Sequence, residues 1–123
     1  MNDNIFLDTN ILVYSYSNSE PGKQTIARNL ISKNNSFIST QVLQELTNTI
    51  TRKFKYSYTH ALNTIDECCQ NNNLHTNTEV TIIQACTIAE RYHFSFYDSL
   101  VIAAALECNC TTLLRRFTQW AIN

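Results

Sequence analysis

The chain has 123 residues, of which 44% are hydrophobic, and this is enough apolar material for one compact domain with a single core. Only 15% of the residues are charged and the formal net charge is −1, so a strongly basic protein that wraps nucleic acid is excluded. A nuclease is not excluded, because bound metal ions can supply the positive charge that meets a phosphate.

The first half of the chain alternates short apolar runs with segments of helical periodicity. An Ile-Phe-Leu run predicts a buried strand that ends abruptly at Asp8. The only proline and the only glycine, at 21 and 22, mark a loop before the next helix. Thr40 follows a second apolar run and is the expected N-cap of a helix. The expected elements here are strands at 5–7 and 37–38 and helices at 11–14, 23–33 and 40–52.

The second half is predicted to be mainly helical. Asn71-Asn72-Asn73 interrupts it, and a final apolar run follows Glu107. The expected elements are helices at 57–70, 78–92 and 95–107 and a strand at 110–114. Short strands that alternate with helices indicate a parallel sheet covered by helices, within one domain that spans 1–123.

Three acidic residues occupy unusual places for surface carboxylates. Asp8 directly follows the first apolar strand, Glu45 lies near the core face of its helix, and Asp98 begins a nearly all-apolar helix. Carboxylates near a core are unfavourable unless they are paired or bind a metal. A divalent cation would remove the repulsion among three converging carboxylates, and oxygen ligands favour Mg²⁺ or Mn²⁺.

Each acid also has a simpler explanation. Asp8 could cap the helix that follows it, Asp98 could favour the N-terminus of its own helix, and Glu45 could pair with a nearby cation. For any one residue the simpler explanation is the better one. The three together favour a shared metal site.

Three segments carry a family resemblance. They are Ile-Phe-Leu-Asp-Thr-Asn-Ile-Leu-Val-Tyr at 5–14, Ile-Ser-Thr-Gln-Val-Leu-Gln-Glu-Leu at 38–46, and Phe-Tyr-Asp-Ser-Leu-Val-Ile-Ala-Ala-Ala at 96–105. In order and spacing they resemble the acidic motifs of PIN-domain ribonucleases of the VapC toxin type. The resemblance extends from residue 4 to about residue 113, and its first and third motifs are the more specific.

This resemblance implies a three-layer α/β/α fold with a central parallel sheet. It implies a metal-dependent endoribonuclease that is the toxin of a toxin–antitoxin pair, with RNA as substrate, a cognate antitoxin as partner and a homodimeric assembly. Asp8, Glu45 and Asp98 would be the catalytic residues and would hold Mg²⁺ or Mn²⁺. Asn10, Ser39 and Ser99 would line the site and contact the substrate.

The C-terminal tail from about residue 114 departs from the family pattern. No Asp or Glu follows Glu107, and Arg115-Arg116 stands where a fourth acidic residue is expected. One choice of codons for this tail, read one base later, encodes Tyr-Ser-Glu-Asp-Leu, so we hypothesise a one-base deletion near Leu113; incompatible codons in the gene would exclude it. The alternative function is therefore a weakened or inactive PIN-fold protein that still binds an antitoxin.

The cysteines and the N-terminus indicate the compartment. Five cysteines, an odd number without a CxxC pair, are expected to be reduced thiols, with Cys86 and Cys108 in the core. The first residues lack the features of a signal peptide, and no run reaches the roughly 18 apolar residues of a membrane span. We therefore expect a cytoplasmic protein without a membrane segment.

Overall fold

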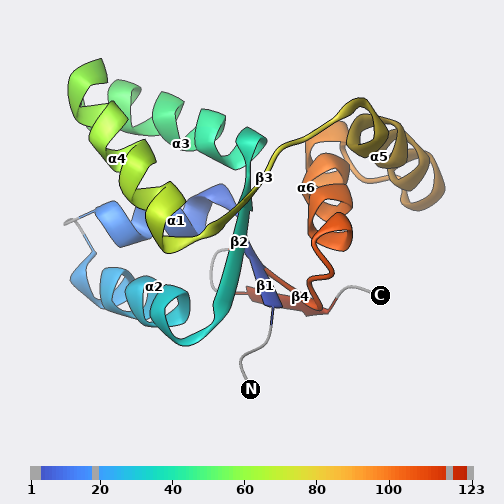
Figure 1. Ribbon diagram of the computed structural model, residues 1–123, viewed down its shortest axis with the longest axis horizontal. Coiled ribbons are helices and arrows are strands. Elements are labelled where there is room, and N and C mark those ends of the chain that lie inside the picture. Colours follow the sequence, from blue (N-terminus) through green and yellow to red (C-terminus); the bar gives the residue numbers. More distant parts are fainter. Residues whose placement is uncertain (1–3, 18–19, 116–117, 122–123) are drawn as a thin grey trace.

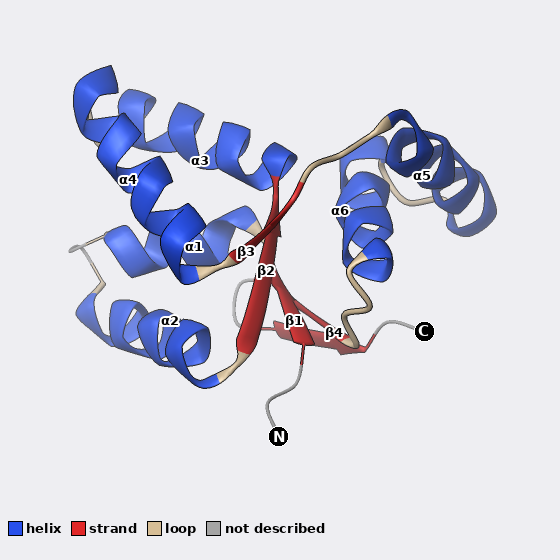
Figure 2. Cartoon of the chain, in the orientation of Figure 1, coloured by secondary structure: helices blue, strands red, loops and turns tan. Residues whose placement is uncertain are grey.

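The computed structural model describes residues 4–17, 20–115 and, for the backbone, 118–121 (Figure 1). Strands and helices alternate through most of the chain, as Figure 2 shows by colour. The strands are β1 (Asn4–Leu7), β2 (Asn35–Ser39), β3 (Asn73–His75), β4 (Thr112–Arg115) and β5 (Thr118–Ala121). The helices are α1 (Thr9–Tyr16), α2 (Pro21–Lys33), α3 (Thr40–Arg52), α4 (Tyr58–Asn71), α5 (Glu79–Tyr92) and α6 (Phe96–Glu107).

The strands form one sheet in the order β3-β2-β1-β4-β5. The pairs β3–β2, β2–β1 and β1–β4 are parallel, and β5 is antiparallel to β4. Helices α1 to α4 lie on one side of the sheet, and α5 and α6 lie on the other (Figure 1). The predicted three-layer α/β/α fold is therefore confirmed. Because β1 and β4 are neighbours, the residues that follow them meet at one edge of the sheet.

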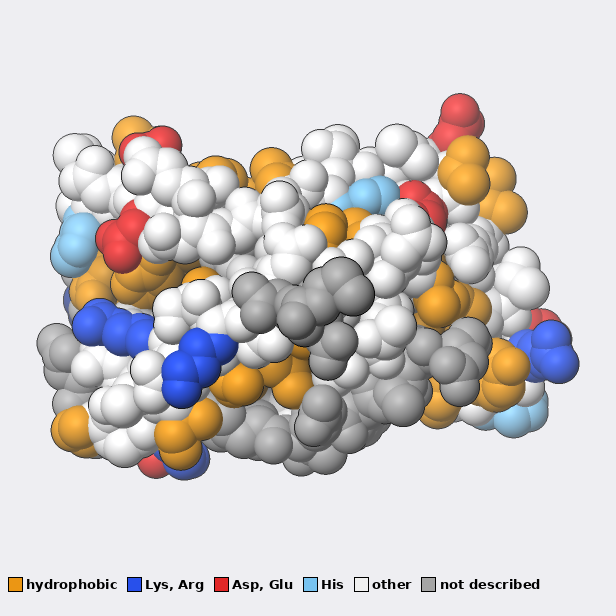
Figure 3. Space-filling model, turned by 60° about the horizontal axis from the view of Figure 1, so that its bottom comes forward, with side chains coloured by type: hydrophobic (Ala, Val, Ile, Leu, Met, Phe, Trp, Pro, Cys, Tyr) orange, Lys and Arg blue, Asp and Glu red, His pale blue; other side chains and the backbone are white. Residues whose placement is uncertain are grey.

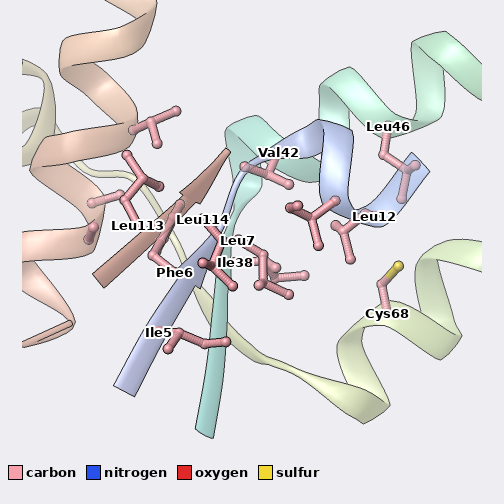
Figure 4. Close-up of a cluster of buried hydrophobic side chains, with 14 of the residues drawn as sticks. Ile5, Phe6, Leu7, Leu12, Ile38, Val42, Leu46, Cys68, Leu113 and Leu114 are labelled. Carbon is pink, nitrogen blue, oxygen red and sulfur yellow. The ribbon is translucent and has the colours of Figure 1, made fainter. Parts of the chain in front are cut away.

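The main core covers both faces of the sheet, because it includes side chains of α1 to α4 on one side and Val101, Ala104 and Ala105 of α6 on the other. In Figure 4, Leu113 and Phe6 lie on the α6 side of the strands, while Leu12, Leu46 and Cys68 lie on the other side. Phe6, Leu7, Ile38, Val42 and Leu46 are each fully buried. Burial of a large apolar side chain stabilises the fold by about 1.5–3 kcal/mol, so this cluster fixes β1 and α3, the two elements that carry Asp8 and Glu45.

Helix α5 packs on α6 around a small cluster of its own. Ala85 and Ile88 of α5 meet Leu100 and Ala103 of α6. Small residues at such a contact let two helices approach closely, and this is why the Ala-rich helix α6 is buried so fully. The pair thus holds α6, which carries Asp98 in its first turn, against the sheet.

Serine side chains cap three of the helices. Ser39 Oγ accepts a hydrogen bond from the backbone N–H of Val42 at 3.3 Å, so it and not Thr40 is the N-cap of α3. Ser57 caps α4, and Ser95 caps α6 by accepting from the N–H of Asp98 at 3.1 Å. Each cap gives a hydrogen-bond partner to one backbone N–H group that would otherwise lack one in the first turn, so these serines set where the helices begin.

Several positions differ from the sequence expectations. Cys86 is exposed and Cys108 is half-buried, so neither is the fully buried core residue that was predicted. Glu45 is exposed, not close to the core face of α3. Strands β3 and β5 were not expected, because a three-residue strand and a polar tail carry no apolar signal by themselves. Pairing with β2 and β4 creates them.

The surface carries few charges. On the face shown in Figure 3, charged side chains are sparse among uncharged polar and apolar ones. Among the described residues, no helix combines the length and the apolar character needed to span a lipid bilayer.

Candidate functional site

Asp8 lies at the carboxyl end of β1, where the strand turns into α1. Its backbone N–H donates to the carbonyl of Leu114 at 3.0 Å, which continues the β1–β4 pairing by one residue. Its Oδ1 accepts from the N–H of Thr9 at 2.7 Å, so the predicted capping role is present. The side chain is only 12% exposed. The second oxygen, Oδ2, remains available for another partner.

Glu45 reaches the same place from α3. It is one and a half turns into the helix, and its Oε1 accepts a hydrogen bond from the hydroxyl of Thr9 at 2.8 Å. Thr9 therefore links the carboxylates of Asp8 and Glu45, one through its backbone and one through its side chain. This contact accounts for an exposed glutamate that points toward the end of β1.

Arg115, the last residue of β4, bridges the carboxylates of Asp8 and Asp98. Its Nε donates to Asp8 Oδ2 at 2.9 Å, and its Nη2 lies 3.1 Å from Asp98 Oδ1. The Arg115 side chain is 28% exposed and the Asp98 side chain 43%. Arg115 holds this position because β4 pairs with β1 in a register that sets residue 115 beside residue 8.

The three acids line one cleft of about 250 Å³. Asn10 also lines it, together with Gln41 of α3 and Tyr97 of α6. The Gln41 Nε2 donates to the Tyr97 carbonyl at 3.4 Å, while the Gln41 Oε1 is buried and has no partner among the described residues. Gln41 thus connects α3 with α6 at the cleft, and Arg115 contacts two of its three acids.

Ser39 and Ser99 are not among the residues that line the cleft. Both are fully buried. Ser39 caps α3, and the Ser99 hydroxyl donates to the carbonyl of Ser95 at 2.8 Å within α6. Their geometry supports the starts of the helices that carry Glu45 and Asp98, and a direct contact with substrate remains a prediction for both.

The cleft as folded does not fit a divalent metal. Carboxylate oxygens are suitable ligands for Mg²⁺ or Mn²⁺. Yet Asp8 and Asp98 are both turned to the guanidinium group of Arg115, and the described part of the chain contains no set of three or more His, Cys, Asp or Glu side chains that could hold a metal ion. The charge of Arg115 neutralises the acids in place of an ion.

Six residues that line the cleft were missed from the sequence, namely Thr9, Gln41, Thr49, Tyr97, Val101 and Arg115. Thr9 directly follows Asp8, and a hydroxyl at the carboxyl end of a strand could have been recognised as a hydrogen-bond donor to the acids of the site. Arg115 was noted only as a positive charge in an unexpected place, although β1–β4 pairing would have brought it to Asp8. Tyr97 belongs to a helix that the sequence presents as nearly all-apolar, but the residue is 65% exposed beside the cleft.

A larger cavity of about 600 Å³ lies between α1, α2 and α4, away from the acids. The thiol of Cys68 donates to the hydroxyl of Tyr16 there at 3.4 Å. Burial raises the pKa of Cys68 from 9.0 to about 11 and also raises the pKa of Tyr16. Both groups therefore stay protonated at neutral pH, and this cavity offers no activated nucleophile.

The sequence of this chain matches a known family, and its fold is similar to those of known proteins. The family model described as PIN domain matches residues 5–116. No curated protein matches the sequence. A toxin–antitoxin complex from Klebsiella pneumoniae is similar to the fold with a TM-score of 0.70 at 16% identity, over 91% of this chain and 85% of that chain.

Two further solved structures have the same fold. VapC20 of Mycobacterium tuberculosis, a toxin that cleaves the sarcin–ricin loop, gives a TM-score of 0.69 at 19% identity, over 89% of this chain and 86% of that chain. VapBC2 of Rickettsia felis, bound to a DNA fragment from its promoter, gives 0.64 at 20% identity, over 91% of this chain and 86% of that chain. At these identities the likeness establishes the fold alone.

Proposed function

Because this chain belongs to the PIN domain family, we propose that it is a metal-dependent endoribonuclease and the toxin of a toxin–antitoxin pair. One observation carries the proposal. Three carboxylates from separate segments, Asp8 after β1, Glu45 in α3 and Asp98 in α6, line one cleft at the carboxyl edge of a parallel sheet. Helix capping by itself explains Asp8 but gives no reason for the other two to face it.

We propose Mg²⁺ or Mn²⁺ as the cofactor, with Asp8, Glu45 and Asp98 as its ligands once Arg115 has withdrawn. Such an ion supplies the Lewis-acid chemistry of phosphodiester hydrolysis. In the resting protein Arg115 neutralises Asp8 and Asp98, and Thr9 orients Glu45 through its 2.8 Å hydrogen bond. Asn10 lines the same cleft and can donate to a phosphate or a water molecule.

A second function is favoured by the same arginine. If Arg115 stays between the carboxylates, the protein keeps the fold but cleaves weakly or not at all, and its role is to bind an antitoxin. The missing fourth acidic residue supports this alternative, since no Asp or Glu follows Glu107. The two functions differ in whether the purified protein binds a divalent ion at millimolar concentration.

The deciding experiment is cleavage of a mixed RNA pool by the purified protein with Mn²⁺, with Mg²⁺ and with EDTA. An Asp98→Asn variant is the matched control, because Asp98 is 43% exposed and its loss leaves the core intact. Cleavage that requires metal and disappears in the variant supports the nuclease. Equal activity of the two proteins would assign the cleavage to a contaminating nuclease and reject the proposal. No cleavage with either metal favours the inactive alternative.

The surface is consistent with the proposed protein partners. Among the described residues, large apolar side chains are exposed on α4 and α5, including Tyr58, Leu62, Val80 and Ile83. These residues lie on opposite sides of the sheet, so each helix offers its own apolar contacts to a partner. We propose a cognate antitoxin and a second copy of the chain as these partners, in the cytoplasm. Light scattering of the protein alone and with the product of a neighbouring gene tests both.

A further inference from the structure

Two further hollows continue the acidic cleft along α3. The first, of about 260 Å³, shares Gln41, Glu45 and Tyr97 with the cleft. The second, of about 320 Å³, shares Gln44 and Asn48 with the first. We call this path the α3 groove. Tyr97 stands at its acidic end and Tyr58 at its far end, and between them α3 lines it with Gln41, Gln44, Glu45, Thr47, Asn48 and Thr51.

The floor of the α3 groove is one face of a helix. Four of these residues, Gln41, Gln44, Asn48 and Thr51, are spaced by three or four positions, so they follow one another along the helix over about 15 Å. Gln44 and Asn48 are exposed, and their side-chain amides make no hydrogen bond with another described residue. A side-chain amide presents two donors and one acceptor, which is the pattern that pairs with the edge of a nucleobase.

An exposed tyrosine stands at each end. The side chain of Tyr97 is 65% exposed and that of Tyr58 is 76% exposed. Tyr97 is also held in place, because Gln41 Nε2 donates to its carbonyl and its ring meets that of Phe96 edge-on at 5.4 Å. An exposed aromatic ring is a surface on which an unstacked base can lie.

We propose that the α3 groove binds the bases of single-stranded RNA, with Tyr97 stacked on the base beside the phosphate at the acidic cleft. This inference rests on the proposed function and assigns its substrate subsite. A single strand is required because bases in a duplex are already paired and stacked. None of the residues that line the two hollows is a lysine or an arginine. Stacking and amide hydrogen bonds, not phosphate contacts, therefore supply the affinity.

The test measures binding without cleavage. Fluorescence anisotropy of a labelled six-nucleotide single-stranded RNA in EDTA compares the protein with Tyr97→Ala, Tyr97→Phe and Tyr58→Ala. Loss of one base-stacking contact weakens binding at least about five-fold, so both alanine variants bind that much more weakly while Tyr97→Phe retains the affinity. The matched control is Tyr92→Ala, since Tyr92 is 54% exposed on α5 and does not line the groove.

Salt dependence gives a second readout. For a site without lysine or arginine, the plot of log affinity against log salt falls with a slope between zero and about −0.7, the value for one phosphate contact on a single strand. A steep slope overturns the inference, and so does unchanged binding by Tyr97→Ala, an equal loss in Tyr92→Ala or no binding at all. Conversion of a dimer to a monomer by Tyr97→Ala, without RNA binding, would identify the groove as a self-association surface instead.

The two proposals fail separately. Binding that depends on Tyr97 in a protein that never cleaves RNA supports the groove and rejects the nuclease. Metal-dependent cleavage, together with an RNA affinity that Tyr97→Ala leaves unchanged, supports the nuclease and rejects the groove.

Discussion

Replacing Arg115 with alanine removes the cation that bridges two carboxylates of the cleft. Breaking a buried ion pair costs about 3–5 kcal/mol and breaking an exposed one about 0.2–1 kcal/mol. Asp8 is 12% exposed and keeps its hydrogen bond from Thr9, so its contact lies between these limits, and Asp98 at 43% exposure adds little. We expect a loss of about 2 kcal/mol of folding free energy, or roughly 8 °C in melting temperature.

The same contact opposes metal binding. A divalent ion that takes Asp8 and Asp98 as ligands must first release Arg115, and the coupling between the two cations is reciprocal. A difference of about 2 kcal/mol corresponds to roughly a 30-fold change in affinity. Arg115→Ala is therefore less stable than the unmodified protein in EDTA, yet it binds Mn²⁺ about 30-fold more tightly.

Thermal unfolding with and without millimolar Mn²⁺, together with calorimetric titration, measures both effects. Binding of an ion at 100 times its dissociation constant stabilises a protein by about 2.7 kcal/mol, so Mn²⁺ should restore the stability that the variant has lost. The control is Arg91→Ala, which removes the same charge from an exposed site over the ring of Tyr92. Equal Mn²⁺ affinity in the Arg115 variant and the unmodified protein would refute the competition, and unchanged stability in EDTA would refute the bridging role.

Further expectations concern Asp98, Ser39 and two buried thiols. Asp98→Asn should lower the cleavage rate by about 100-fold or more, because losing even a residue that only hydrogen-bonds to a metal ligand lowers activity 10–100-fold. The melting temperature should stay nearly unchanged. Comparable cleavage rates would show that Asp98 is not part of the site. Ser39→Ala should lower the free energy of unfolding by about 1 kcal/mol through loss of the α3 cap, which chemical denaturation measures and Ser39→Thr should largely prevent. Burial raises the pKa of the Cys68 thiol from 9.0 to about 11 and that of the Cys110 thiol from 9.0 to about 12. The folded protein therefore keeps these protons up to a higher pH than the unfolded chain does. Their stabilisation is complete below pH 9 and is lost as the pH rises through 11 and 12, by up to about 1.4 kcal/mol per pH unit for each thiol, and a flat profile above pH 9 would contradict this.

The elements that were predicted well are those with a strong local pattern. Residues 5–7 and 37–38 were expected to be strands and lie in β1 and β2, and the helix expected to end at Arg52 does end there. The errors fall where tertiary contacts decide. Strand β3 has three residues and exists because it pairs with β2, and Cys86 was expected in the core but is exposed on α5.

The sequence by itself determined the family, the α/β order of the elements and the three acids, because apolar periodicity and short motifs are local properties of the chain. The position of Arg115 is a property of the tertiary structure. Only the parallel pairing of β1 with β4 sets a residue near the C-terminus 2.9 Å from Asp8, and only the packing of α6 brings Asp98 to the same guanidinium group. Contacts between residues 107 positions apart depend on register and helix docking, and no local pattern encodes them.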